Sequence, residues 1–105
     1  MTVPIHPWAT VIVPINDERD NLVPLLEGLL TVMSSHAASQ TRPFEIIFVD
    51  DGSTDGSSEE LDRLAAQHPE VTTLHFDQNY GKTCALDAGF SRSSGELIIG
   101  IDGDL

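Results

Sequence analysis

The sequence is poor in cysteine, in basic residues and in long apolar runs, and each shortage excludes a class of protein. Its 105 residues include one cysteine, Cys84, so an internal disulfide is excluded and a reducing compartment is expected. Five Lys and Arg against 17 Asp and Glu give a formal net charge of −12, which excludes the basic surface that nucleic acid or anionic lipid requires. No run approaches the roughly 20 apolar residues of a membrane span, and the first residues lack a signal-peptide pattern. We therefore expect a cytoplasmic protein.

What is present suits one small α/β domain covering residues 1–105, because 40% of the residues are hydrophobic. Short apolar runs predict four strands, at residues 9–14, 44–49, 71–76 and 96–101. Apolar residues at helical spacing predict helices at residues 18–36, 57–67 and 81–93. This alternation predicts a mostly parallel sheet of about four strands, joined by right-handed crossovers and flanked by helices.

Two residue patterns set element boundaries. Pro14 is expected to end the first strand, because proline has no N–H for a sheet hydrogen bond. Ser57 and Glu60 have the spacing of a capping box, which predicts the start of the second helix.

A polar cluster with acidic residues follows every predicted strand. The clusters are Asn16–Glu18, Asp50–Ser53, Asp77–Asn79 and Asp102–Asp104. The carboxyl ends of parallel strands meet at one edge of a sheet, which is where such folds bind ligands. Four acidic clusters on one edge are expected to need a counter-ion or a cationic group of a ligand, so we predict a binding site there.

Asp102-Gly103-Asp104 is the cluster with the clearest metal chemistry. If the strand continues through them, residues two apart point to the same face. Two carboxylates side by side suit Mg²⁺ or Mn²⁺ carrying a phosphorylated ligand. The alternative is an acidic turn, because Asp-Gly is common in turns.

Asp50 and Asp51 are adjacent acids at the end of a strand that is apolar at nearly every position. A turn or helix cap would need one acid, and Thr54, Asp55 or Ser57 is available to cap the next helix. An acidic side chain at this place can accept a hydrogen bond from a ribose hydroxyl or a base N–H. At least one of the two is therefore a candidate ligand-binding residue.

Lys82 is the only lysine in the chain and lies at the predicted start of a helix. The stretch Gly81-Lys82-Thr83 is similar to the end of a phosphate-binding P-loop, but Phe76 stands where that pattern requires glycine. Three interpretations stay open for Lys82: contact with a phosphate, an ion pair with nearby acids, or solvation. The four histidines lack metal-ligand spacing and are assigned to surface or strand positions.

Three ordered stretches resemble the N-terminal half of family 2 glycosyltransferases of the GT-A fold, most closely the dolichyl- or polyprenyl-phosphate sugar transferases. They are residues 13–22, residues 49–56 (Val-Asp-Asp-Gly-Ser-Thr-Asp-Gly) and residues 79–105, from Asn-Tyr-Gly-Lys to Asp-Gly-Asp-Leu. The resemblance implies a Rossmann-like nucleotide-binding half. It also implies that Pro14 and Glu18 line the nucleotide pocket and that Asp50 or Asp51 holds the base or ribose.

The same resemblance implies that Asp102 and Asp104 hold Mg²⁺ or Mn²⁺ on the diphosphate of a UDP- or GDP-linked sugar, with Lys82 near the phosphates. The metal would act as Lewis acid for the departing diphosphate. A polyprenyl phosphate is the implied acceptor, which would place the full-length protein at the cytoplasmic face of a membrane.

Two departures from the family pattern limit these assignments. Asn16 and Asp17 stand where the family has an aromatic residue followed by Asn. The pattern also continues after Leu105 with a Gln, an acceptor-binding half that supplies the catalytic base, and often membrane helices. The sequence therefore predicts a truncated donor-binding part that contains no catalytic base and transfers no sugar alone.

Three alternatives remain at this point. A nucleotidyltransferase would have a Gly-rich basic loop after the first strand, and Asn16–Asp20 is not one. A receiver-like phosphoacceptor domain would need a fifth strand ending in Lys. A non-catalytic remnant of a glycosyltransferase is the third.

Overall fold

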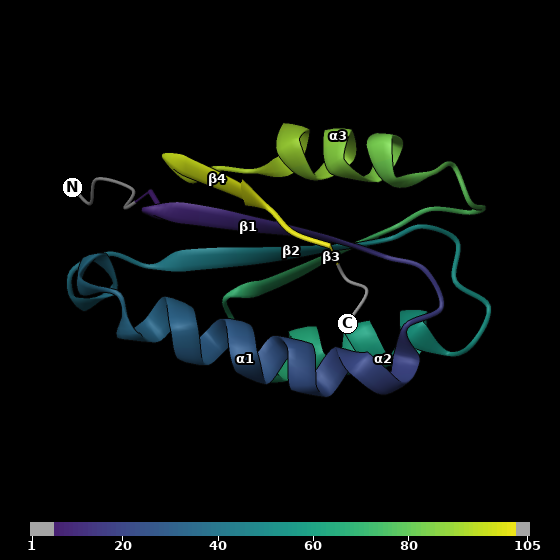
Figure 1. Ribbon diagram of the computed structural model, residues 1–105, viewed down its shortest axis with the longest axis horizontal. Helices are drawn as coiled ribbons and strands as arrows, with labels where there is room; N and C mark the ends of the chain where they lie inside the picture. Colours follow the sequence, from purple (N-terminus) through teal and green to yellow (C-terminus); the bar gives the residue numbers. More distant parts are fainter. Residues whose placement is uncertain (1–5, 103–105) are drawn as a thin grey trace.

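The computed structural model describes residues 6–102, which form four strands and three α-helices (Figure 1). In chain order these are β1 (Ala9–Ile15), α1 (Leu22–Ser35), β2 (Phe44–Asp50), α2 (Ser57–Gln67), β3 (Val71–His75), α3 (Lys82–Arg92) and β4 (Leu97–Gly100). Short 3₁₀ turns, η1 (Arg19–Asn21) and η2 (Ala37–Gln40), flank α1. The predicted α/β class and the alternation of strands with helices are confirmed.

The four strands form one sheet in the order β3-β2-β1-β4, and every neighbouring pair is parallel. The register places Ile15 opposite Asp50, and Asp50 opposite His75. The loops that leave β1, β2 and β3 therefore meet at one edge, on the right of Figure 1. The chain returns through helices between the strands, as parallel pairing requires.

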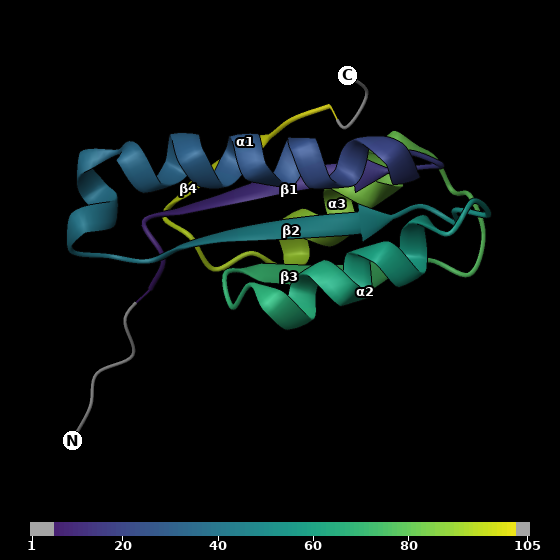
Figure 2. The same cartoon turned by 90° about the horizontal axis from the view of Figure 1, so that it is seen from below.

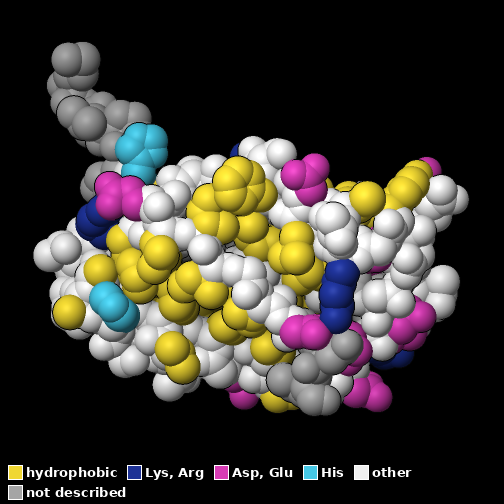
Figure 3. Space-filling model, turned by 45° about the horizontal axis from the view of Figure 1, so that its top comes forward, with side chains coloured by type: hydrophobic (Ala, Val, Ile, Leu, Met, Phe, Trp, Pro, Cys, Tyr) yellow, Lys and Arg dark blue, Asp and Glu magenta, His cyan; other side chains and the backbone are white. Residues whose placement is uncertain are grey.

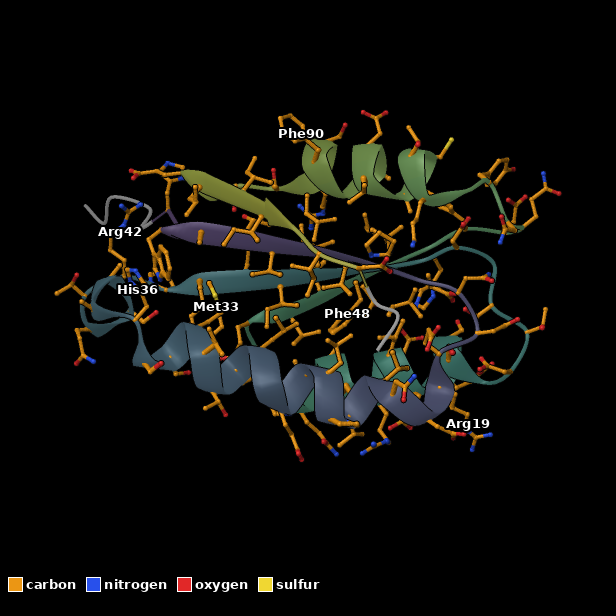
Figure 4. All side chains as sticks on the ribbon, viewed as in Figure 1. Arg19, Met33, His36, Arg42, Phe48 and Phe90 are labelled. Carbon is orange, nitrogen blue, oxygen red and sulfur yellow. The ribbon has the colours of Figure 1, made fainter. Side chains whose placement is uncertain are left out.

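Helices cover both faces of the sheet, with α1 and α2 on one face and α3 on the other (Figures 1 and 2). Side chains alternate between the two layers, as expected for strands. Val11 and Phe48 pack in the layer of α1 and α2, whereas Ile12 and Val49 pack in the layer of α3. Figure 4 shows Phe48 between the sheet and α1. Because β1 and β2 are covered on both faces, they are apolar at nearly every position.

Pro14 does not end β1, and the prediction that it would is wrong by one residue. The strand continues to Ile15, and Pro14 lies opposite Val49 of β2. Alternate residues direct their main-chain groups to the same neighbour, and the carbonyl of Ile12 accepts the N–H of Ile101 on the β4 side. Pro14 shares that side, beyond the last β1–β4 pair, so its missing N–H breaks no ladder hydrogen bond.

The start of α2 also differs from the capping-box prediction. Gly56 is the N-cap residue, with a positive φ of 95°, and Ser57 is already the first helical residue. The Asp55 carboxylate accepts the Ser57 N–H at 2.9 Å, which satisfies one of the otherwise unpaired amides of the first turn. Glu60 instead pairs with Arg63 one turn later.

The face that carries α3 is less completely covered than the opposite one. Leu86 and Phe90 of α3 are exposed, and Figure 3 shows hydrophobic side chains on the surface of the molecule seen from this side. Within residues 6–102, no helix combines the length and the apolar character that crossing a membrane would take.

Two helical glycines make a matched test of this packing. Gly89 of α3 lies directly over Ile12, where an added Cβ would collide with the branched Ile12 side chain, whereas Gly28 of α1 has open space around it. We expect Gly89→Ala to lower the free energy of unfolding by about 1–3 kcal/mol through overpacking. Gly28→Ala should raise it by about 0.5–1 kcal/mol through helix propensity. Urea unfolding followed by circular dichroism measures both, and equal effects of the two substitutions would contradict the close α3–β1 packing.

Candidate functional site

Asp51 joins the three loops at the carboxyl edge of the sheet. Its carboxylate accepts the N–H of Tyr80 at 2.7 Å on Oδ1 and the N–H of Gly81 at 3.0 Å on Oδ2. Its main-chain carbonyl accepts the side-chain amide of Asn16 at 2.8 Å. Asp51 is only 4% exposed, so these main-chain donors replace the water that the carboxylate loses. The loops after β1, β2 and β3 are thereby fixed relative to one another.

Gly52 allows the second and third loops to approach closely. Its φ is +71°, and a Cβ at this position would lie 2.5 Å from the main-chain nitrogen of Asn79 and closer still to Gln78. A side chain here would force the two loops apart. The glycine is thus required both for its backbone conformation and for the short distance between the loops.

Asp17 makes a second connection, between the first and second loops. Its carboxylate accepts the N–H of Thr54 at 2.7 Å, and its own N–H is donated to Ser53 Oγ at 3.0 Å. Asp17 has a φ of +52°, which is uncommon outside glycine, although Asp is among the residues that tolerate it. The two hydrogen bonds hold it in that conformation.

A cavity of about 330 Å³ opens beside these connections, which is in the size range of small-molecule sites. It is lined by Pro14, Ile15, Asn16, Asp51, Asn79, Gly81 and Lys82. A second hollow of about 240 Å³ shares Pro14 and Lys82 with it and extends over Leu86, Gly100, Ile101 and Asp102. Because the two hollows share Pro14 and Lys82, their apolar residues and the polar groups of separate loops form one continuous surface.

Lys82 and Asp102 meet where the two hollows join. Lys82 Nζ lies 2.9 Å from Asp102 Oδ2, and both side chains are 56% exposed. An ion pair that exposed contributes little to stability. Lys82 is also the first residue of α3, where the helix dipole favours an anion. The pair offers a cation for a phosphate and a hard oxygen for a metal ion.

The predicted metal ligands lie at the limit of what the structure describes. Asp102 lines the second hollow, whereas Asp104 lies outside the described residues. Within residues 6–102, no group of three or more His, Cys, Asp or Glu side chains could hold a metal ion. One or two carboxylates completed by phosphate oxygens is the usual donor set for Mg²⁺, so Asp102 fits such an ion and the Asp102–Asp104 pair stays a prediction.

Asp50 lies behind the cavity and does not line it. Only 2% exposed, it accepts the N–H of Ser53 at 2.9 Å on Oδ1, and its Oδ2 lies 3.0 Å from His75 Nδ1. Burial raises the pKa of Asp50, but the hydrogen bonds from Ser53 and His75 outweigh that effect and hold the pKa below its usual value. In the structure Asp50 orders the turn after β2.

Glu18 also lies away from the cavity lining. Its N–H is donated to Ser57 Oγ at 3.2 Å, and its Oε2 accepts the side-chain amide of Asn21 at 2.7 Å. Of the predicted site residues, the structure thus brings Pro14, Asp51, Lys82 and Asp102 to one surface. The ligand contacts predicted for all of them, and for Glu18 and Asp50, stay predictions.

Sequence reasoning did not single out Asn16, Asn79 or Gly81 as cavity residues, and it dismissed His75. The parallel register would have revealed His75, because aligned strand ends place it directly beside Asp50. Asn16 and Asn79 belong to clusters that the sequence did mark at strand ends, and Gly81 directly precedes Lys82, which the sequence also marked. Which member of a cluster faces the cavity depends on loop conformation, which periodicity does not encode.

Two glycines with left-handed backbone conformations test the loop connection. We expect Gly52→Ala to lower the free energy of unfolding by about 1 kcal/mol for its positive φ, and further for the collision with Gln78 and Asn79. Gly56→Ala, whose nearest neighbour is the flexible Arg19 side chain, should lose only the first contribution. Denaturant unfolding of both variants makes the comparison, and an equal loss would argue against the close approach of the two loops.

Three comparisons with known proteins bear on this site. The sequence model of the family described as Glycosyl transferase family 2 matches residues 10–105. The undecaprenyl-phosphate 4-deoxy-4-formamido-L-arabinose transferase of Yersinia enterocolitica is 40% identical over 98 residues, covering 91% of this chain and 28% of the relative. The dolichyl-phosphate beta-glucosyltransferase of Trichomonas vaginalis is 33% identical, covering 96% and 30%. The chain spans less than a third of the length of these relatives.

Solved structures agree with the sequence relatives. The mannosyltransferase PcManGT from Pyrobaculum calidifontis, in complex with GDP-Man and Mn²⁺, has a TM-score of 0.75 and 29% identity, over 94% of this chain and 28% of that one. The S. aureus protein TarS in complex with UDP-GlcNAc also has a TM-score of 0.75, over 91% of this chain and 26% of that one. At 22% identity it shows the fold alone.

These matches decide against the nucleotidyltransferase and receiver-like alternatives. They agree with the strand order, with the loops gathered at one edge and with the resemblance noted in the sequence. Because the family's sequence model matches residues 10–105 and so nearly the whole chain, this chain belongs to glycosyl transferase family 2.

Proposed function

We propose that this chain binds the nucleoside diphosphate portion of a UDP- or GDP-linked sugar, as the donor-binding part of a glycosyltransferase. One observation carries the proposal: Lys82 and Asp102 lie 2.9 Å apart at the junction of two hollows on the carboxyl edge of the sheet. A sugar nucleotide has a flat polar base, a diol and a diphosphate in a row. The continuous surface offers contacts for each of these parts.

The nucleoside belongs in the larger hollow. Pro14 and Ile15 supply apolar surface, while Asn16, Asp51 and Asn79 bring polar atoms from three loops. Asp51 uses each carboxylate oxygen once for a main-chain N–H. A carboxylate has about four lone-pair positions, so Asp51 retains capacity to accept a ribose hydroxyl or a base N–H.

The diphosphate belongs at the junction. The Lys82 ammonium and the N-terminus of α3 present positive charge there, in a protein whose net charge is otherwise strongly negative. Asp102, together with Asp104, would hold Mg²⁺ or Mn²⁺ at the same place. When bound, such an ion supplies Lewis-acid stabilisation for the departing diphosphate. The PcManGT complex with GDP-Man and Mn²⁺ supports this part of the proposal.

A polyprenyl phosphate is the proposed acceptor of the whole protein. The names of the Yersinia and Trichomonas relatives, an undecaprenyl-phosphate and a dolichyl-phosphate sugar transferase, support this choice. A lipid-linked acceptor would place the reaction at a membrane surface, and we propose the cytoplasmic face. Within this chain the side chains position and neutralise the donor, and we assign none of them the role of catalytic base.

Calorimetric titration of the chain with UDP-glucose and GDP-mannose, with and without Mn²⁺, tests the proposal. We expect one of the two to bind, and to bind more tightly with Mn²⁺. Lys82→Gln should weaken binding by about 10- to 100-fold, as expected for a lost charge-assisted hydrogen bond. Asp102→Asn should remove the gain that Mn²⁺ brings.

Two variants on the same helix serve as controls. Arg92→Gln and Asp87→Asn make the same changes of charge on exposed residues of α3 that line neither hollow. They should leave both affinities unchanged. Absence of binding to either sugar nucleotide would overturn the proposal and favour a non-catalytic remnant. Binding that ignores Mn²⁺ and survives Asp102→Asn would reject the metal assignment.

A further inference from the structure

His75, at the end of β3, contacts a carboxylate with each of its ring nitrogens. Nδ1 lies 3.0 Å from Asp50 Oδ2, and Nε2 lies 2.7 Å from Asp62 Oδ1. The hydroxyl of Ser58 is also 3.0 Å from Nδ1. These groups come from β2 and α2, the two elements packed around the ring. A third of the His75 side chain remains exposed, whereas Asp50 is almost fully buried.

The two carboxylates determine the protonation state that fits this geometry. A neutral imidazole has one N–H and one lone pair, so it can donate to only one carboxylate, and its lone pair would face the other. The imidazolium donates from both nitrogens and satisfies both acids. When it is protonated, His75 also forms an ion pair with Asp50.

A series of hydrogen bonds leads from Asp50 to the cavity. The Oδ1 atom of Asp50 accepts the Ser53 N–H, and Ser53 Oγ accepts the N–H of Asp17. Asp17, in its left-handed conformation, directly follows Asn16, which lines the larger hollow. The orientation of the Asp50 carboxylate therefore bears on the position of the loop after β1.

We propose that His75 is a positioning residue of the nucleotide cavity. As an imidazolium, it fixes the carboxylate of Asp50, and through Ser53 and Asp17 it holds Asn16 against the cavity. This inference rests on the proposed function, because it assigns His75 a role toward the same site. His75 itself lines neither hollow.

The arrangement has a pH dependence of defined sign. Burial lowers the pKa of His75, but its hydrogen bonds to Asp50 and Asp62 outweigh that effect and raise the pKa above the usual 6.5. Stabilisation from a raised pKa is complete below 6.5 and is lost as the pH rises through the folded value. The lowered pKa of Asp50 acts at the other end, where stabilisation is present above 3.8 and lost as the pH falls through the folded value. The loops should therefore be most ordered between these limits.

The hydrogen bonds that lead from His75 through Asp50 and Ser53 to Asp17 form a relay. NMR titration of the isotopically labelled 105-residue chain tests this relay directly, without a ligand. We expect the amides of Ser53 and Asp17 to shift with the midpoint of the His75 ring, above pH 6.5. Asp62→Asn changes an exposed side chain, keeps the Asp50 contact and should move all these midpoints to lower pH. His75→Gln should abolish the shared transition. His68→Gln, a histidine just before β3 and 3.8 Å from Glu70, is the matched control and should leave it intact.

Affinity for UDP-glucose or GDP-mannose, whichever binds the chain, gives the second readout. The diphosphate of either sugar nucleotide is esterified at both ends, so no ligand phosphate titrates near neutral pH. We expect affinity to fall about fivefold as His75 loses its proton, the equivalent of one hydrogen bond. The His75→Gln variant should bind the sugar nucleotide weakly at every pH, and the Asp62→Asn variant should show the fall in affinity at lower pH.

The two readouts separate this proposal from the one it rests on. If the amides of Ser53 and Asp17 shift with the His75 titration but the chain binds no sugar nucleotide, the proposed function is rejected and the relay is supported. Amides of Ser53 and Asp17 that ignore the His75 titration, or that respond equally in His75→Gln, would overturn the relay whatever the affinity.

Discussion

The carboxylate of Asp51 is the contact on which the candidate site depends. A carboxylate this deeply buried is stable only when hydrogen-bond donors replace its water, and here the donors are the main-chain amides of Tyr80 and Gly81. Satisfying the charge therefore fixes the third loop against the second, while Asn16 fixes the first to the same residue. A cavity wall built in this way is preformed, so a ligand would find it ordered without the entropic cost of closing loops.

The parallel sheet explains why such a contact can form at all. Strands β1 and β2 are buried on both faces, and their common direction brings three loops to one edge within reach of a single side chain. The same register places His75 beside Asp50, one residue away from Asp51. The two adjacent acids thus have different structural roles: Asp51 orders the wall of the cavity, and Asp50 orders the turn behind it.

The elements and the edge that holds the site were predictable from the sequence, because apolar periodicity and strand-end polarity are local patterns. The roles of individual side chains at this edge were less predictable. Asp50 and Asp51 could not be told apart, because which carboxylate faces the cavity depends on the turn at Gly52. The capping-box prediction at Ser57 was wrong because the carboxylate of Asp55, and not that of Glu60, accepts the Ser57 N–H. His75 was dismissed because its partners come from β2 and α2, and this pairing appears only once the strand register is known.

The distribution of negative charge also differs from what the sequence suggested. We expected four acidic clusters to share a need for a counter-ion. Four carboxylates at this edge instead accept main-chain N–H groups: those of Asp17, Asp51 and Asp55 from a neighbouring loop, and that of Asp50 from its own loop. Their charge is satisfied inside the fold and does not require a metal. Asp102 differs from them, since its side chain is 56% exposed and pairs with the ammonium of a lysine, a side chain with a long flexible stem. A divalent ion with its phosphate could pair with both groups of this ion pair, so we assign the proposed metal contact at this edge to Asp102.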